Sequence, residues 1–170
     1  MNLLQTIRLI ERSAALQPGV RTIVRNDIYR LNACPDVDYG VFAWLQSEHT
    51  SEDGSSIISY NFTFFYADRL TTDKANELEV QSQGIETLEN ILRSLPALGL
   101  YPAGYSFRAF NERFSDECAG VYCTVTLDAG KDTLCATAYE SLNGSQGYNP
   151  SRSGEGWSWT TPNGKTVKII

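Results

Sequence analysis

The sequence predicts an α+β fold: a mostly antiparallel sheet with two helices packed on one of its faces, followed by a C-terminal extended arm or small hairpin. Two patterns carry this prediction. Apolar residues recur at helical spacing near both ends of the first hundred residues, and elsewhere apolar and polar residues alternate as they do in strands. The composition then changes, because Gly, Ser, Asn and Pro fill 15 of the 24 positions from Ser141 to Gly164. We therefore expect one α+β domain at residues 1–140 and an arm with a terminal β-hairpin at 141–170.

The first helix is expected to begin at Asn2, because Asn2 and Gln5 have the spacing of a capping pair. Apolar residues then recur at helical spacing up to Pro18-Gly19, at Leu3, Ile7, Ile10 and Ala14. A basic connector follows. We expect a short strand at 27–31 and a turn at 32–38, where Pro35 lies.

Two strands are expected next, joined by a polar loop at 47–55 around Asp53-Gly54. The strand at 39–46 has apolar side chains on both faces. In the second strand one face is apolar and aromatic, with Ile58, Tyr60, Phe62, Phe64 and Tyr66. This alternation predicts that one face of the second strand is buried in the core.

A long amphipathic helix should follow, with Thr71-Thr72-Asp73 providing its N-terminal cap. Its predicted apolar stripe consists of Leu78, Ile85, Leu88, Leu92 and Leu95, and its polar face of Glu79, Gln83, Glu86 and Asn90. Gly84 in the middle costs about 1 kcal/mol relative to Ala, which indicates close packing or a bend. Pro96 and Gly99 are expected to end the helix.

Three further strands are expected, at 104–110, 119–127 and 133–140, with a turn at 128–131. The terminal hairpin is predicted at 156–161 and 165–170, around Pro162-Asn163-Gly164. In it, Trp157 and Trp159 would share a face with Val167 and Ile169. We expect the arm to extend away from its own domain and dock on a neighbouring subunit by strand pairing of residues 165–170.

The net charge of −6 and a pI near 4.8 disfavour general binding of nucleic acid, which requires excess Lys and Arg. Charge is unevenly distributed: residues 1–35 carry +3, whereas residues 36–53 hold five acids and no basic residue. Such segments could dock neighbouring copies or be ordinary solvated surfaces. We therefore take as candidate interface residues Arg8, Arg12, Arg21, Arg25, Asp36, Asp38, Trp157, Trp159, Val167 and Ile169.

The cysteines predict no metal site. Cys34, Cys118, Cys123 and Cys135 lack the spacing of a zinc site. They could form two disulfides, but without a recognisable signal peptide we expect buried free thiols from a reducing cytoplasm. No apolar run approaches the roughly 20 residues that span a bilayer, so we expect a soluble protein without membrane partners.

Catalytic chemistry is also weakly indicated. The single histidine, His49, is expected in an exposed loop, with no second histidine and no nucleophile motif. The acids at Asp36, Asp38, Asp53 and Asp68 do not follow a calcium-loop spacing. The glycine-rich segment at 144–156 lacks a phosphate-binding pattern. We expect no catalytic residue, metal or cofactor.

The stretch YNFTFFYADRL-TTD, leading into ANELEVQSQGIETLENIL, follows an N-terminal helix and a long-looped hairpin. This layout, over roughly residues 1–130, resembles the small neck and tail-completion proteins of tailed bacteriophages, particularly tail terminators. The resemblance implies a homo-oligomeric ring, commonly a hexamer, that caps the tail tube, contacts other neck and tail-tube proteins and lets DNA pass without specific binding. It implies a virion protein assembled in the host bacterial cytoplasm.

The arm departs from the compact pattern of that family, so the position within the neck or tail stays open. A different tail-tube, minor tail or secretion-apparatus adaptor component is the first alternative. A small hydrolase built on His49 is the second.

Overall fold

The computed structural model describes residues 1–27, 37–51, 53–113, 117–131, 148, 150–153 and 156–170. Their helical elements are α1 (Leu3–Ala15), α3 (Glu77–Ser94) and the short 3-10 helix η1 (Leu95–Leu98). Their strands are β1 (Thr22–Arg25), β2 (Val41–Thr50), β3 (Ile57–Arg69), β4 (Leu100–Arg113), β5 (Glu117–Gly130), β6 (Ser151–Ser153), β7 (Gly156–Thr160) and β8 (Thr166–Ile169).

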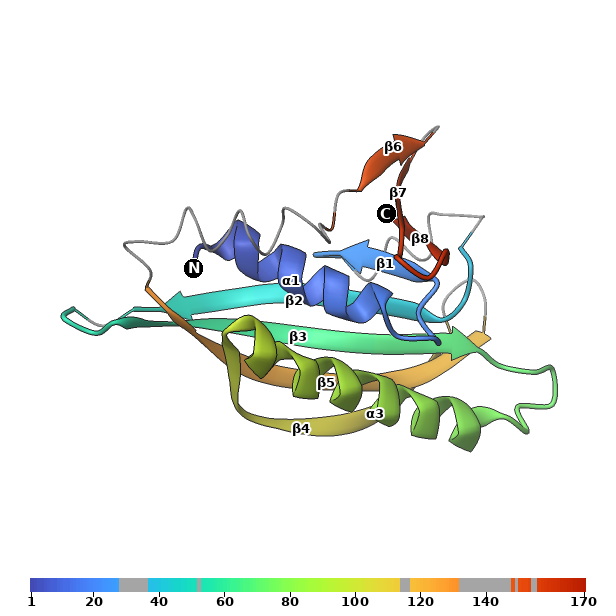
Figure 1. The fold of residues 1–170 in the computed structure, drawn as a ribbon. Coiled ribbons are helices and arrows are strands. Elements are labelled where there is room, and N and C mark those ends of the chain that lie inside the picture. Colours follow the sequence, from blue (N-terminus) through green and yellow to red (C-terminus); the bar gives the residue numbers. More distant parts are fainter. Residues whose placement is uncertain (28–36, 52, 114–116, 132–147, 149, 154–155) are drawn as a thin grey trace.

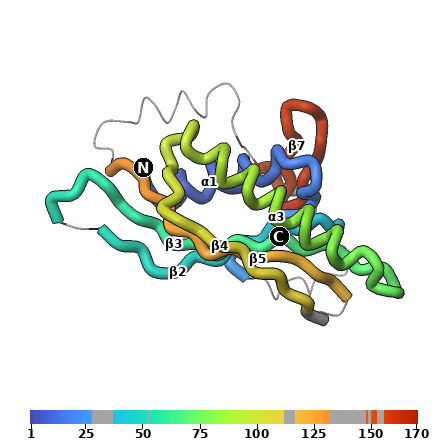
Figure 2. Tube along the Cα trace, turned by 90° about the horizontal axis from the view of Figure 1, so that it is seen from below, coloured from blue at the N-terminus to red at the C-terminus, as the bar shows by residue number. Residues whose placement is uncertain are grey.

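These strands form a single sheet in the order β4-β5-β3-β2-β1-β8-β7-β6. All neighbours pair antiparallel except β1, which pairs in parallel with both β2 and β8. Figures 1 and 2 show α1 and α3 on the same face of the sheet, with α3 over β3 and β5. The predicted α+β fold, with a mostly antiparallel sheet and two helices on one face, is confirmed.

The main core lies between this sheet and the two helices. On β3, Tyr60, Phe62, Phe64 and Tyr66 are at most 3% exposed and belong to one hydrophobic cluster with residues of both helices. The predicted alternation of β3 is therefore confirmed. It places every second side chain under the helices because successive strand residues point to opposite faces.

The start of α1 is confirmed, because Asn2 and Gln5 form a reciprocal capping box. The start of α3 was predicted wrongly. The Thr71 hydroxyl donates to the Asp73 carboxylate, 2.7 Å away, and α3 begins only at Glu77. The side chain of Asn76 donates to the Arg69 carbonyl, so residues 70–76 form a polar turn instead of a helix cap.

The predicted apolar stripe of α3 is wrong in its N-terminal half. Leu78 is 78% exposed and Ile85 40% exposed, whereas the buried stripe consists of Val80, Gly84, Thr87, Leu88, Ile91 and Leu92. At about 100° per residue, Leu78 and Ile85 lie roughly 100–120° around the helix from Gly84, the middle of the buried stripe, so they fall on its flank. The face with Glu79, Gln83, Glu86 and Asn90 is exposed, as predicted.

Close packing at Gly84 is confirmed. A Cβ atom added there would lie 3.1 Å from Cδ1 of Tyr66 on β3 and 3.2 Å from Cγ2 of Val121 on β5. The end of the helix is also as predicted, because η1 contains Pro96 and stops at Gly99, which has a left-handed φ of 78°.

Three strand predictions need correction. Residues 22–25, expected as a connector, form β1, and β2 continues through residues 47–50, which were expected in a loop. The expected turn at 128–131 lies largely in β5, because Ile57 still pairs with Gly130. The strand expected at 27–31 lies outside the described residues except for Asp27, which is not in a strand, and the one expected at 133–140 lies wholly outside them.

The terminal hairpin is present as β7 and β8, but it does not extend away from the domain. β8 pairs with β1 of the same chain, with Ile23 opposite Ile169. The Lys165 ammonium donates to the carbonyls of Gln17 and Val20, which join α1 to β1. The prediction that this segment docks on a neighbouring subunit by strand pairing is therefore wrong: β8 already has its partner within the chain.

Candidate assembly surfaces

A cluster of polar side chains beneath α1 fixes the position of that helix. The Glu11 side chain is fully buried and accepts two hydrogen bonds from the Arg25 guanidinium, each 2.6 Å long. It also accepts one from the Trp44 indole nitrogen at 3.1 Å. The hydrogen bond that Arg25 donates to Glu11 raises the pKa of Arg25 above its usual value. Arg25, predicted as an interface residue, is partly exposed and binds Glu11 within the chain, which ties β1 to α1.

The remaining basic candidates lie nearer the surface. Arg8 and Arg21 are exposed, and Arg12 is half-buried. Asp38, one of the acids expected to face them, has its contacts within the chain. Its carboxylate lies 3.0 Å from the Lys168 ammonium, and its backbone carbonyl accepts a hydrogen bond from the Thr22 hydroxyl. Asp36 lies outside the described residues.

The four candidates on the terminal hairpin divide in two. Trp159, Val167 and Ile169 are at most 6% exposed and belong to the main core cluster, so they hold the hairpin on its own domain. Trp157 is 49% exposed although it pairs with buried Ile169. Only Trp157 among the four is exposed enough for contact with another molecule.

An exposed apolar strip, which sequence reasoning missed, lies at the β4 end of the sheet. We call it the end strip, and it consists of the exposed residues Leu78, Ile85, Tyr105 and Ala109 and of Phe107, which is half-buried against the main core. The opposite flank of α3 faces α1, because Ser94 bonds to Ser13 and Gln83 lies beside Gly19. A turn of about 100° per residue then places Leu78 and Ile85 on the flank toward β4.

The β4 part of the end strip follows from the strand register. Phe107 pairs with Cys123 and Ala109 with Val121, so both point to the helix-covered face. The rings of Tyr105 and Phe107 are 5.5 Å apart. Because β4 is the last strand of the sheet, no described strand covers its outer edge. A sequence signal was available: Val80, Leu88, Ile91 and Leu95 fall within an arc of about 80° on the helix, and Leu78 and Ile85 lie outside that arc.

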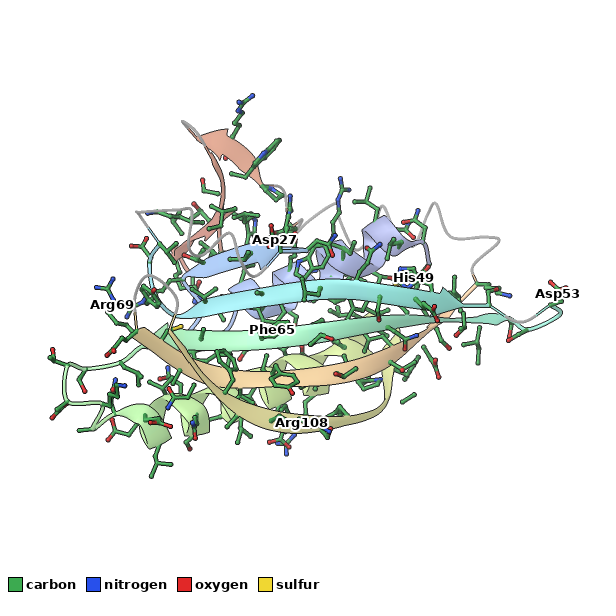
Figure 3. All side chains as sticks on the ribbon, turned by 180° about the vertical axis from the view of Figure 1, so that it is seen from behind. Asp27, His49, Asp53, Phe65, Arg69 and Arg108 are labelled. Atoms are coloured by element: carbon green, nitrogen blue, oxygen red, sulfur yellow. The ribbon has the colours of Figure 1, made fainter. Side chains whose placement is uncertain are left out.

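The sheet has two further exposed features. The β2–β3 hairpin reaches beyond the helices to its tip near Asp53 (Figures 1 and 3). Figure 3 looks onto the face opposite the helices, where Phe65 and Arg108 are labelled. On this face Phe65 stacks with Tyr122 at 5.8 Å and meets Phe110 edge-on at 6.4 Å.

His49 lies on β2 opposite Tyr60, not in an exposed loop as predicted. Its ring meets that of Tyr60 edge-on at 5.1 Å, and both ring nitrogens are buried without a hydrogen-bond partner among the described residues. A general base needs a group that orients it and a proton within reach. The described residues around His49 supply neither.

The described residues contain no cluster of three or more His, Cys, Asp or Glu side chains that could hold a metal ion. Cys118 and Cys123 are buried free thiols, as predicted, and burial raises the pKa of Cys123 to about 12. Such a thiol is not a nucleophile at neutral pH. Cys34 and Cys135 lie outside the described residues. Neither helix of the described part has the length and apolar content of a membrane span.

Comparison with known proteins identifies no family for this chain. No protein-family model matches it, and no curated protein matches it.

Proposed function

We propose that the protein is a non-enzymatic structural protein of a tailed-phage virion. In this role copies of the chain form a ring at the head–tail neck or at the tail end, of the tail-terminator or connector type. The ring caps the tail tube and lets DNA pass through its centre. The observation that carries the proposal is the layout: helix, long projecting hairpin, covering helix and two long strands, in the order of the resemblance described above.

The use of polar groups supports an assembly role. The buried carboxylate of Glu11 is engaged by Arg25 and Trp44, so it is not available as a proton acceptor for a substrate. Asp38 pairs with Lys168, and Glu89 with Arg93, on the surface. In the described residues, charged groups thus hold elements together or face solvent.

The exposed surface also supports an assembly role. Eight large apolar side chains among the described residues are at least 40% exposed, and they lie at the sheet ends, on the helices and on the β2–β3 hairpin. A sheet with an uncovered edge and exposed apolar side chains is suited to contacts between subunits. The acidic net charge is compatible with DNA passing without adhesion, since like charges repel.

The test is to purify the full chain and measure its mass in solution, then to image it with tail tubes of the cognate phage. A subunit has a mass of 18.9 kDa, so a closed ring has a multiple of that mass and is visible as an annulus. We expect rings bound at tube ends. Rings that stack into tubes would favour the tail-tube alternative, and a monomer at all concentrations, with or without tubes, would contradict the proposal.

A further inference from the structure

The two ends of the sheet carry unlike but complementary surfaces. At the β4 end lies the end strip, with Leu78 and Ile85 among its exposed members. The same helix carries Glu77, Glu79, Glu86 and Glu89, of which Glu89 pairs with Arg93, and residues 73–94 hold five acids and two basic residues, a net charge of −3. The β4 end is thus apolar with an acidic border.

The other end is formed by the β6–β7–β8 hairpin. Trp157 of β7 is 49% exposed and pairs directly with exposed Arg152 of β6. Residues 150–170 carry three basic side chains, but Lys165 donates to the carbonyls of Gln17 and Val20 and Lys168 pairs with Asp38, so Arg152 is the basic side chain offered to a partner. Tryptophan and arginine are both enriched among the residues that contribute most to binding near the centres of protein interfaces.

The two surfaces lie at opposite ends of one sheet, as Figures 1 and 3 show. Two copies can therefore bring the hairpin end of one against the β4 end of the next without using either surface twice. Such a contact between unlike surfaces is heterologous, and repeated contacts of this kind close into a ring when the rotation between copies allows it. A contact between two β4 ends would instead give a twofold dimer and would bring two acidic borders together.

We propose that the subunit contact is made by the hairpin end of one copy, centred on Trp157 and Arg152, seated on the end strip of a second copy of this chain. Trp157 lies against Leu78 and Ile85, and Arg152 faces the acidic side chains of α3. The inference rests on the proposed ring and names the surfaces that build it. The occupant is a second copy because the charge and the apolar anchor that the end strip requires are both present at the other end of the same chain.

The test uses two double variants of the full chain, each changed at one end only. Leu78→Glu with Ile85→Glu alters the end strip, and Arg152→Glu with Trp157→Thr alters the hairpin end. The four side chains are exposed, so the thermal melts should match that of the unaltered protein. Ile57→Thr is the matched control, because Ile57 is also 49% exposed but lies near the tip of the β2–β3 hairpin.

We expect each double variant alone to be monomeric, with association weakened about 30-fold or more, as substitution of central interface residues commonly does. An equimolar mixture of the two should give 1:1 dimers and nothing larger. In that mixture one intact hairpin end meets one intact end strip, and the two altered ends block further growth. The Ile57→Thr protein should form rings as the unaltered protein does.

Rings formed by either double variant alone would overturn this inference, as would a mixture that stays monomeric. If the unaltered protein forms rings and the variants do not disturb them, the inference falls and the proposed function stands. If the mixing result is as expected but rings do not bind tail tubes, the proposed function falls and the inference stands. A monomeric unaltered protein overturns both.

Discussion

The helix-covered face of the sheet and the opposite face use the same strands in different ways. On β3 the side chains under the helices are aromatic and nearly fully buried, whereas Asn61, Thr63 and Phe65 on the other face are only partly buried. A second, small cluster on that face consists of Val24, Val41, Ala43 and Ala67.

This difference separates the side chains that stabilise the fold from the side chains that are available for contact with another molecule. Side chains that are fully removed from water supply most of the folding free energy, roughly in proportion to the apolar area buried. The exposed side chains on the opposite face and at the sheet ends contribute less to folding, so they can be altered without unfolding the chain. The following variants test this separation, from the largest expected effect to the smallest.

Replacing Leu88, which is fully buried on α3, with Ala should lower the free energy of unfolding by about 2–5 kcal/mol because it leaves a cavity. Ile85→Ala on the same helix is the matched control, and its loss should be much smaller because Ile85 is 40% exposed. Urea unfolding of both variants measures the difference. Equal losses would show that the two flanks of α3 are equally buried.

Replacing Glu11 with Ala should cost about 2–3 kcal/mol, since Arg25 and the Trp44 indole lose a charged hydrogen-bond acceptor in a buried site. Arg25 is partly exposed and can regain water, which limits the loss. Arg108→Ala on the opposite face should change stability by less than about 0.5 kcal/mol. A Glu11 variant as stable as Arg108→Ala would show that the buried ion pair does not stabilise the fold.

Tyr66→Phe should leave stability at pH 7 unchanged or raise it by about 1 kcal/mol. The Tyr66 hydroxyl is buried without a hydrogen-bond partner among the described residues, and removing it relieves that cost.

The same variant should change the response to alkaline pH. Burial raises the pKa of Tyr66 above its ordinary value of 10.0. The unfolded chain therefore releases this proton first, and the contribution of Tyr66 to stability falls as the pH rises above 10. Unfolding measured from pH 8 to 11 should show a shallower loss in Tyr66→Phe. An identical slope in both proteins would contradict the assignment.

Charge reversal at Glu79 and Glu86 should have the smallest effect on folding. Both lie on the exposed face of α3, where charges usually contribute within about 0.5 kcal/mol. A thermal melt of the double Glu→Lys variant should nearly match that of the unaltered protein. If the variant unfolds, this face is covered and the orientation of α3 is wrong.

Several elements could be predicted because their signal is local. The capping box of α1, the alternation of β3 and the end of η1 at Gly99 follow from neighbouring residues alone. The polar end of β2, residues 47–50, was not predictable from pattern, because this part of the hairpin projects beyond the helices and no alternation of buried and exposed side chains marks it.

The candidate surfaces could be predicted only in part. Trp157, predicted as a contact residue, is exposed, but Trp159 and Ile169 have the same chemical character and are buried. Composition does not distinguish them: Trp157 and Trp159 share one face of β7, and Trp159 is buried against Tyr148 whereas Trp157 is not covered. Arg25 is a similar case: its charge alone predicts a surface residue, but in the structure its guanidinium binds the buried Glu11 carboxylate.

The sequence by itself determined the α+β class, the helix-covered face of β3 and the exposed acidic face of α3, because residue periodicity fixes which side chains share a face. Only the tertiary structure decided that residues 22–25 form a strand and that the terminal hairpin belongs to the sheet. β1 is four residues long and has no hairpin partner, so its hydrogen bonds come from β2 and from β8, which follows it by more than 140 residues. Strand pairing across such a distance depends on which backbone edges meet in space, and that is not written in any local pattern.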